Sequence, residues 1–313
     1  MKKTLTTALA TGVLALSASI ASAGEIAVIV KTTNSNFWQN VNKGATAAIE
    51  GQSEHTLSFN GPASESAVAD QVSLVENAIN RGVSAIVLAP SDPEALAPVV
   101  KRAFESGIPV AIIDSGLAEG SEQYYQTFLS TDNCAAGEQA AQLMIDNAGS
   151  TGKVAVMSYV AGVGSEIGRV GCFVDYIDAN SDIEIVGPLY SQSQMATALN
   201  QTTDTLAANG DLVGIFGANE PTAIGMGRAI EQAGKAGQLT AIGFDGNADL
   251  QDMVKSGTLL ATAVQGSFQM GELGVNAVID ILAGNEVEDF IDTGVIMVTK
   301  ENIDAPEAQN VLY

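Results

Sequence analysis

The chain has 313 residues, with 13 Lys and Arg against 36 Asp and Glu, which gives a formal net charge of −23. With 46% apolar and 16% charged residues, it is too apolar for a disordered chain and long enough for two domains with separate cores. The negative charge argues against nucleic acids and anionic membranes as partners, because both attract clustered Lys and Arg. One His and two Cys leave little room for a zinc site or a Cys–His nucleophile.

Residues 1–23 (MKKTLTTALATGVLALSASIASA) have the pattern of a signal peptide. Two lysines precede an apolar stretch that is too short for a good membrane span, and the last three residues fit the small-x-small cleavage rule. We therefore expect cleavage after Ala23 and an exported, soluble chain that starts at Gly24. The alternative is an uncleaved N-terminal anchor.

From Glu25 onward, short β-branched runs alternate with longer runs of helical periodicity. The first run, EIAVIV, is nearly continuous in apolar residues, which is typical of a parallel strand covered on both faces. Apolar residues then recur at helical spacing from Phe37 to Ile49, and Pro93 begins a later helix that Gly107 ends. The other expected strands are 84–88, 109–113, 153–158, 183–187, 212–216, 240–244 and 260–264.

This alternation predicts an α/β fold with parallel, doubly wound sheets. A single sheet of about ten strands would be possible, but two smaller sheets suit the chain length better. Because no long flexible linker separates the halves, we expect short crossings between them.

Polar and aromatic side chains follow the expected strands, at the edge where open parallel sheets bind ligands. Carboxylates accept hydrogen bonds from vicinal hydroxyls, amides both donate and accept, and aromatic rings stack on C–H faces. The set therefore suits a neutral polyhydroxy ligand. Its members include Lys31, Phe37, Trp38, Asp114, Asn219, Glu220, Asp245 and Gln265.

Some of these residues also have a structural interpretation. Asp114 and Asp245 could be N-caps of the helices that follow them. Phe37 and Trp38 are adjacent, so their side chains point in different directions on a helix, and we expect at most one in the deep core. His55 stands in a polar stretch and is expected on the surface.

The two cysteines, Cys134 and Cys172, leave two possibilities open. They could form a disulfide in an oxidising compartment, or both could stay reduced and buried.

Motifs of the common cofactor and hydrolase classes are missing or incomplete. Gly162 and Gly164 follow a strand, but Ile167 stands where a dinucleotide-binding loop needs its third glycine. There is no GxxxxGK[ST] loop and no GxSxG elbow. We therefore expect no cofactor and no metal.

Several segments, taken in order, resemble the periplasmic sugar-binding proteins of ABC importers, of the ribose/allose/galactose type (type I periplasmic binding proteins). The segments are VIVKTTNSNFWQNVNKGA, VAIIDSG, STDNCAAGEQAA, GRVGCF, IFGANEPTAIGMGRAIEQAGKAG, IGFDGNADL and LLATAVQGSFQMGELG.

The resemblance implies two doubly wound lobes joined by a hinge of three crossings, near residues 130–133, 264–266 and 292–295. The implied N-terminal lobe is 24–131 plus 266–293, and the implied C-terminal lobe is 132–265 plus 294–313. The implied ligand-binding residues are the stacking pair Phe37 and Trp38 and the hydrogen-bonding residues Asp114, Arg169, Asn219, Asp245 and Gln265, with Lys31 in the ligand loop.

The resemblance also implies a function. The protein would capture a neutral monosaccharide or polyol in the interlobe cleft and deliver it to a membrane permease. It would act in the periplasm as a monomer without enzymatic activity, and a chemoreceptor is a further candidate partner. Lys31, Ala89 and Ser115 depart from ribose binders, so a hexose, a ketose or a polyol is as plausible as ribose.

Other classes of function remain open at the sequence level. The same scaffold could carry a signal molecule or a chemoreceptor ligand. A secreted glycoside-active enzyme would use Asp114 and Asp245 as a carboxylate pair. The ligand core of a repressor is disfavoured by the signal peptide and by the lack of a DNA-binding headpiece.

Overall fold

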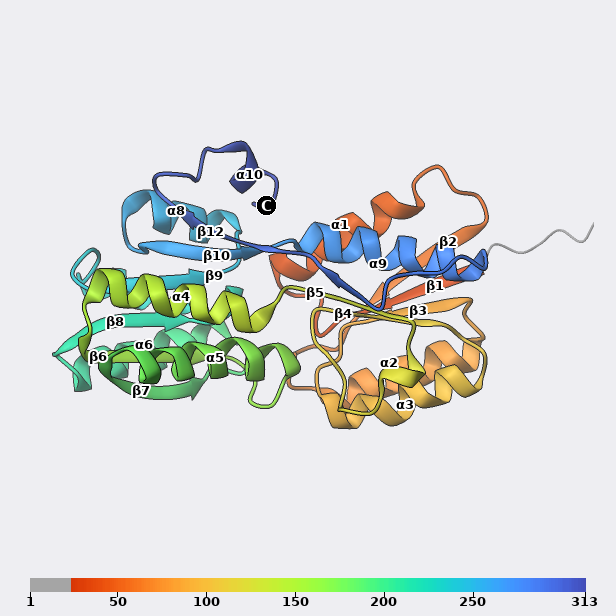
Figure 1. The fold of residues 1–313 in the computed structure, drawn as a ribbon, viewed down its shortest axis with the longest axis horizontal. Helices are drawn as coiled ribbons and strands as arrows, with labels where there is room; N and C mark the ends of the chain where they lie inside the picture. The colour runs from red at the N-terminus through yellow and green to blue at the C-terminus, as the bar shows by residue number, and fades with distance from the viewer. Residues whose placement is uncertain (1–23) are drawn as a thin grey trace, which may run out of the picture.

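The computed structural model describes residues 24–313 and folds them into two α/β lobes, each built on a six-stranded sheet (Figure 1). The strand orders are β11-β5-β4-β3-β1-β2 and β12-β10-β9-β8-β6-β7, which match position by position. Five strands of each lobe therefore repeat one parallel topology, and the predicted fold class is confirmed. The sixth strands differ, because β11 runs parallel to β5 and β12 runs antiparallel to β10. The expected signal peptide, 1–23, lies outside the described residues.

The first lobe carries its helices on both faces of its sheet. Its strands are β1 (Gly24–Ile29), β2 (His55–Asn60), β3 (Ala85–Leu88), β4 (Val110–Ile113), β5 (Thr127–Ser130) and β11 (Phe290–Asp292). Its helices are α1 (Asn36–Ile49), α2 (Val68–Arg81), α3 (Pro93–Glu105), the 3-10 turn η1 (Glu122–Tyr124) and α9 (Ser267–Leu282).

The second lobe is built in the same way. Its strands are β6 (Thr151–Ser158), β7 (Asp182–Tyr190), β8 (Leu212–Gly217), β9 (Thr240–Phe244), β10 (Ala261–Gln265) and β12 (Val295–Thr299). Its helices are α4 (Asn133–Ala148), α5 (Gly164–Asn180), α6 (Met195–Ala208), α7 (Glu220–Gln232), α8 (Ala248–Ser256) and α10 (Pro306–Gln309).

The chain passes between the two sheets three times: after Ser130, after Gln265 and after Asp292 (Figure 1). The first and third crossings are tied together, because Thr131 Oγ1 donates a hydrogen bond of 3.1 Å to the carbonyl of Gly294. The lobes are thus joined by three short segments that run close together, as the fold class predicts.

The first strand explains why its sequence is apolar throughout. Ile26 and Val28 pack on one face of the sheet against α1 and α9, whereas Ala27 and Ile29 pack on the other face against α2 and α3. Successive side chains of a strand point to opposite faces, so a strand between two helical layers needs apolar residues at every position.

The edge strand β2 was not indicated by the sequence pattern. Only Leu57 and Phe59 of its six residues (HTLSFN) are apolar, and most of its residues are only half-buried because β2 has one neighbour. The expectation that His55 lies in a surface loop is wrong, since it begins β2 and is half-buried. Polar edge strands of this kind resemble loops in sequence.

Cys134 and Cys172 form a disulfide with a Cα–Cα distance of 5.1 Å. The bond joins the first turn of α4 to the middle of α5. Of the two possibilities that the sequence leaves open, a disulfide or two reduced cysteines, the structure shows the disulfide.

Two glycines allow α1 and α9 to pack with their backbones in contact. A Cβ atom on Gly44 of α1 would lie 1.9 Å from the carbonyl oxygen of Phe268, and one on Gly271 of α9 would lie 2.0 Å from that of Val41. These distances are far below van der Waals contact, so any side chain at either position would push the helices apart.

We predict that Gly44→Ala lowers the midpoint of thermal unfolding, because overpacking typically costs about 1–3 kcal/mol. The matched control is Gly171→Ala in α5, where an added Cβ has no neighbour within 4 Å. Alanine is the better helix former, so the control should melt at or above the wild-type temperature. Equal melting temperatures for both variants would contradict this packing.

Candidate functional site

A cavity between the lobes contains about 320 Å³ of space between protein atoms and is partly open to solvent. Residues that follow the carboxyl ends of the strands in both sheets reach it, which is where open α/β sheets bind ligands. All eight residues chosen from the sequence line it: Lys31, Phe37, Trp38, Asp114, Arg169, Asn219, Asp245 and Gln265. Six further residues complete the lining: Ser35, Glu65, Tyr159, Ser165, Glu220 and Pro221.

Asp114 and Asp245 occupy equivalent places, one after β4 and the other after β9. Neither is an N-cap, since the N-caps of the helices that follow them, η1 and α8, are Ser121 and Asn247. Instead, both aspartates have positive φ angles, 63° and 80°. Such left-handed backbone is uncommon outside glycine and clusters at functional sites.

Equivalent hydroxyl groups anchor the two aspartates. Ser130 Oγ on β5 donates a hydrogen bond of 2.7 Å to the carbonyl of Asp114. Thr262 Oγ1 on β10 donates one of 2.7 Å to the carbonyl of Asp245. Each aspartate is therefore held by the neighbouring strand of its own sheet, which leaves its carboxylate directed toward the cleft.

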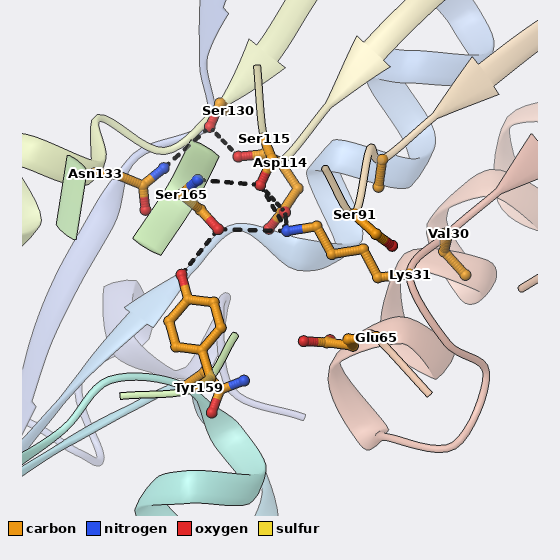
Figure 2. Close-up of polar contacts among 12 residues, drawn as sticks. Val30, Lys31, Glu65, Ser91, Asp114, Ser115, Ser130, Asn133, Tyr159 and Ser165 are labelled. Atoms are coloured by element: carbon orange, nitrogen blue, oxygen red, sulfur yellow. Dashed lines mark hydrogen bonds and ion pairs between the residues drawn. The ribbon is translucent and has the colours of Figure 1, made fainter. Parts of the chain in front are cut away.

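Lys31 carries a buried charge at the meeting point of the lobes (Figure 2). Its Nζ lies 2.6 Å from Asp114 Oδ2 and donates to Ser115 Oγ at 2.6 Å and, across the cleft, to Ser165 Oγ at 3.3 Å. The hydroxyl of Tyr159 continues the chain, 2.9 Å from Ser165 Oγ. Burial raises the pKa of Tyr159 above its ordinary value, so this group stays a protonated phenol at neutral pH.

Arg169 is fixed in the second lobe by acceptors around its whole guanidinium group. Its Nη1 donates to the carbonyl of Ala218 at 2.6 Å, and its Nε and Nη2 donate to Asn133 Oδ1 at 3.1 and 2.7 Å. Nη2 also donates to Gln265 Oε1 at 3.2 Å. The guanidinium lies 3.6 Å from the ring centre of Phe244, a cation–π arrangement that holds its plane.

Asp245 is a hydrogen-bonded acid with a raised pKa. Its Oδ1 accepts from Gln265 Nε2 at 2.8 Å, and its Oδ2 accepts from the backbone N–H of Glu220 at 2.8 Å. Burial raises the pKa of Asp245 to about 6, although the charge of Arg169 opposes the rise. Burial and the charge of Asp245 raise the pKa of Glu220 to about 7.

The aromatic pair stands in the first turn of α1. Ser35 caps this helix, and its Oγ accepts from the backbone N–H of Trp38 at 3.3 Å. Phe37 and Trp38 meet edge to face with ring centres 4.8 Å apart. The expectation that at most one is deeply buried is wrong, because both rings belong to the apolar cluster of the first lobe as well as to the cavity lining.

Asn219 combines a structural and a cleft-facing role. Its Oδ1 accepts from Thr222 N at 3.3 Å as the N-cap of α7, and its Nδ2 donates to Ser193 Oγ at 3.0 Å.

Two lining residues outside the sequence-based set differ in how they could have been found. Tyr159 directly follows β6, so the rule that selected the other strand-end residues applies to it as well. Glu65 lies in the loop after β2. Because the sequence did not predict this strand, the strand-end rule could not select Glu65.

No group of three or more His, Cys, Asp or Glu side chains among residues 24–313 is arranged to hold a metal ion.

Across those same residues, no helix is both long and apolar enough to cross a membrane.

Residues 26–286 match the family model for the periplasmic binding protein domain, and the chain belongs to this family. It is 31% identical over 293 residues to the ribose import binding protein of Haemophilus influenzae, covering 92% of this chain and 96% of that protein. It is 29% identical over 272 residues to the D-allose-binding periplasmic protein of Escherichia coli, covering 85% of this chain and 87% of that protein.

A solved structure gives a stronger match. It is an ABC transporter solute binding protein from Agrobacterium vitis with bound D-fucose. The two chains are 71% identical and superpose with a TM-score of 0.92, over 93% of this chain and 100% of the other.

We predict that Glu220 makes the protein less stable as the pH rises. The pKa of Glu220 is raised from 4.5 to about 7 in the folded chain, so the folded state holds a proton that the unfolded state releases in this window. The free energy of unfolding contributed by Glu220 is therefore largest below pH 4.5 and falls as the pH rises toward about 7. Glu220→Gln cannot ionise and should flatten this fall.

The measurement compares thermal unfolding midpoints at about pH 5 and about pH 8. Glu54→Gln serves as the control, because Glu54 is exposed and lies outside the cavity lining. The control should keep the wild-type pH dependence, and the same dependence in Glu220→Gln would show that this carboxyl is not the source.

Proposed function

We propose that this protein is the solute-binding component of an ABC importer, and that it captures a neutral monosaccharide or polyol between its lobes and delivers it to a membrane permease. One observation carries the proposal: equivalent strand ends of the two lobes direct Asp114 and Asp245 into one cavity. D-fucose is the first candidate ligand, because the relative that is 71% identical was solved with it bound.

The charges around the cavity favour an uncharged ligand. Its lining holds four acidic side chains but two basic ones, and both basic groups already contact protein acceptors. An anionic sugar would add negative charge where acids are in excess, at a cost that burial increases. The acidic residues are Glu65, Asp114, Glu220 and Asp245, and the basic ones are Lys31 and Arg169.

Each predicted site residue has a role that its chemistry supports. The two aspartates accept hydrogen bonds from sugar hydroxyls, and Phe37 and Trp38 contact the apolar face of the ring. The donors are Lys31, Arg169, Asn219 and Gln265.

Binding is coupled to hinge closure in this proposal. The lobes divide at 24–131 plus 266–293 and 132–265 plus 294–313, and each supplies half of the site. A ligand that contacts both halves binds the closed form more tightly than the open one and shifts the balance by that difference. Periplasmic binding proteins are a known example of hinge closure around a ligand.

The closed form is what the permease recognises, and a chemoreceptor is a second candidate partner. The exported chain is cleaved after Ala23 and acts in the periplasm as a monomer, without cofactor and without catalysis.

We predict that Asp114→Ala weakens D-fucose binding by more than about tenfold, because a hydrogen bond to a charged group contributes roughly 1.5–3 kcal/mol. Asp114→Asn keeps the shape of the side chain and removes its charge, so it separates lost hydrogen bonding from the loss of the ion pair with Lys31. Isothermal titration calorimetry of the purified protein measures both.

Asp178→Asn on α5 is the matched control, since Asp178 is exposed and lies outside the cavity lining. It should bind D-fucose like the wild type. Unchanged affinity in both Asp114 variants would refute the site, whereas a wild-type protein that binds no neutral monosaccharide or polyol in a panel would refute the function.

A further inference from the structure

Each lobe sends one glutamate across the cleft to the other. Glu65, in the loop between β2 and α2 of the first lobe, accepts a hydrogen bond from the hydroxyl of Ser193 in the second lobe. Glu220, the first residue of α7 in the second lobe, accepts one of 2.8 Å from the backbone N–H of Asn36, the first residue of α1. The two carboxylates thus make reciprocal contacts between the lobes.

Both carboxylates are buried and held by a second donor. Glu65 is 6% exposed and its Oε1 accepts from Trp38 Nε1 at 2.8 Å, while Glu220 is 3% exposed and its Oε2 accepts from the hydroxyl of Tyr313 at 3.0 Å. Neither is ion-paired with a basic side chain within residues 24–313. Hydrogen bonds from both lobes therefore fix these groups.

The glutamates stand at the boundary between two spaces. Next to the cavity described above, the cleft opens into an outer chamber, which contains about 880 Å³ of space between atoms and is partly open to solvent. Four residues line both spaces: Ser35, Glu65, Glu220 and Pro221. We call these four residues the partition.

The outer chamber has walls that a carbohydrate could contact. Its lining comes from both lobes, and half of it consists of uncharged polar side chains. The rest is apolar or charged, and the charged members outside the partition, Arg228 and Asp249, form an ion pair. Its polar members include Thr32, Asn34, Asn36, Ser64, Ser193, Gln194 and Asn247. A substituent on a sugar bound in the cavity between the lobes can enter the outer chamber only by passing the partition.

The partition is linked to the predicted binding residues on both sides. Trp38 and Ser193 both donate hydrogen bonds to Glu65. Ser193 also accepts a hydrogen bond from Asn219. Ser193 and the preceding Gln192 both have positive φ angles, 54° and 57°. Two consecutive non-glycine residues in this region are costly, and contacts on both sides of the turn hold them there.

We propose that Glu65 and Glu220 are specificity-determining residues that limit the ligand to an unsubstituted monosaccharide by closing the passage to the outer chamber. The inference rests on the function proposed above. A ring substituent that reaches the partition has to displace a buried carboxylate from its hydrogen-bond donors in both lobes. Leaving such groups unpaired is an effective way to reject a near-isosteric ligand.

The test uses the neutral sugar that binds the wild type, beginning with D-fucose. Calorimetry measures its affinity and that of its mono-O-methyl derivatives at every ring position, including both methyl glycosides. We expect the wild type to prefer the free sugar over at least one derivative by about tenfold or more. Glu65→Ala and Glu220→Ala should each reduce that preference at the same position by about tenfold.

Ser193→Ala is a milder variant that keeps the bond between Trp38 and Glu65 and removes the contact across the cleft. It should relax the same preference in part, and it tests the partition even if a glutamate variant does not fold. Glu54→Ala is the matched control, since Glu54 is exposed and lines neither space. It should keep the wild-type ratios.

The outcomes separate the two claims. Wild-type ratios at every position in the folded partition variants would overturn the role of the partition while the binding function stands. Equal affinity of the wild type for the free sugar and for every derivative would also overturn the role of the partition. A wild type that binds no neutral sugar would remove the proposed function, and this inference with it.

Discussion

Buried charge in the cleft is the constraint on which the rest of the structure depends. Lys31 and Arg169 are each 2% exposed, and an ion of this size costs several kcal/mol to bury without compensation. Asp114 of its own lobe compensates Lys31, and Ser165 of the other lobe adds a hydrogen bond. Because some partners of the buried groups lie across the cleft, the contact between the lobes and the internal order of the site stabilise each other.

The repeated topology of the lobes explains why two acids converge. β4 of one sheet and β9 of the other hold the same place in their strand orders, so the residue that follows each strand emerges at the cleft. Asp114 and Asp245 share a positive φ and a hydroxyl anchor from the neighbouring strand. A polyhydroxy ligand between them meets acceptors on both sides, which ties its binding to closure.

The sequence predicts the fold and the candidate site to different depths. Central strands such as β1 are apolar on both faces, so their pattern is unambiguous, whereas the polar edge strand β2 resembles a loop. The strand-end rule and the family resemblance selected eight residues that line one cavity. Glu65 was not predicted as a site residue because its loop follows β2, the strand that the sequence did not indicate. Its contact with Ser193 depends on how the lobes meet, which no local sequence pattern encodes.

The central claim is that an uncharged sugar sits between the carboxylates of the two lobes. A crystal structure of the protein grown with D-fucose tests it most directly. We predict sugar oxygens within about 2.5–3.0 Å of the carboxylates of both Asp114 and Asp245 in the same complex. A sugar bound to one lobe alone, or outside the interlobe cavity, would contradict it.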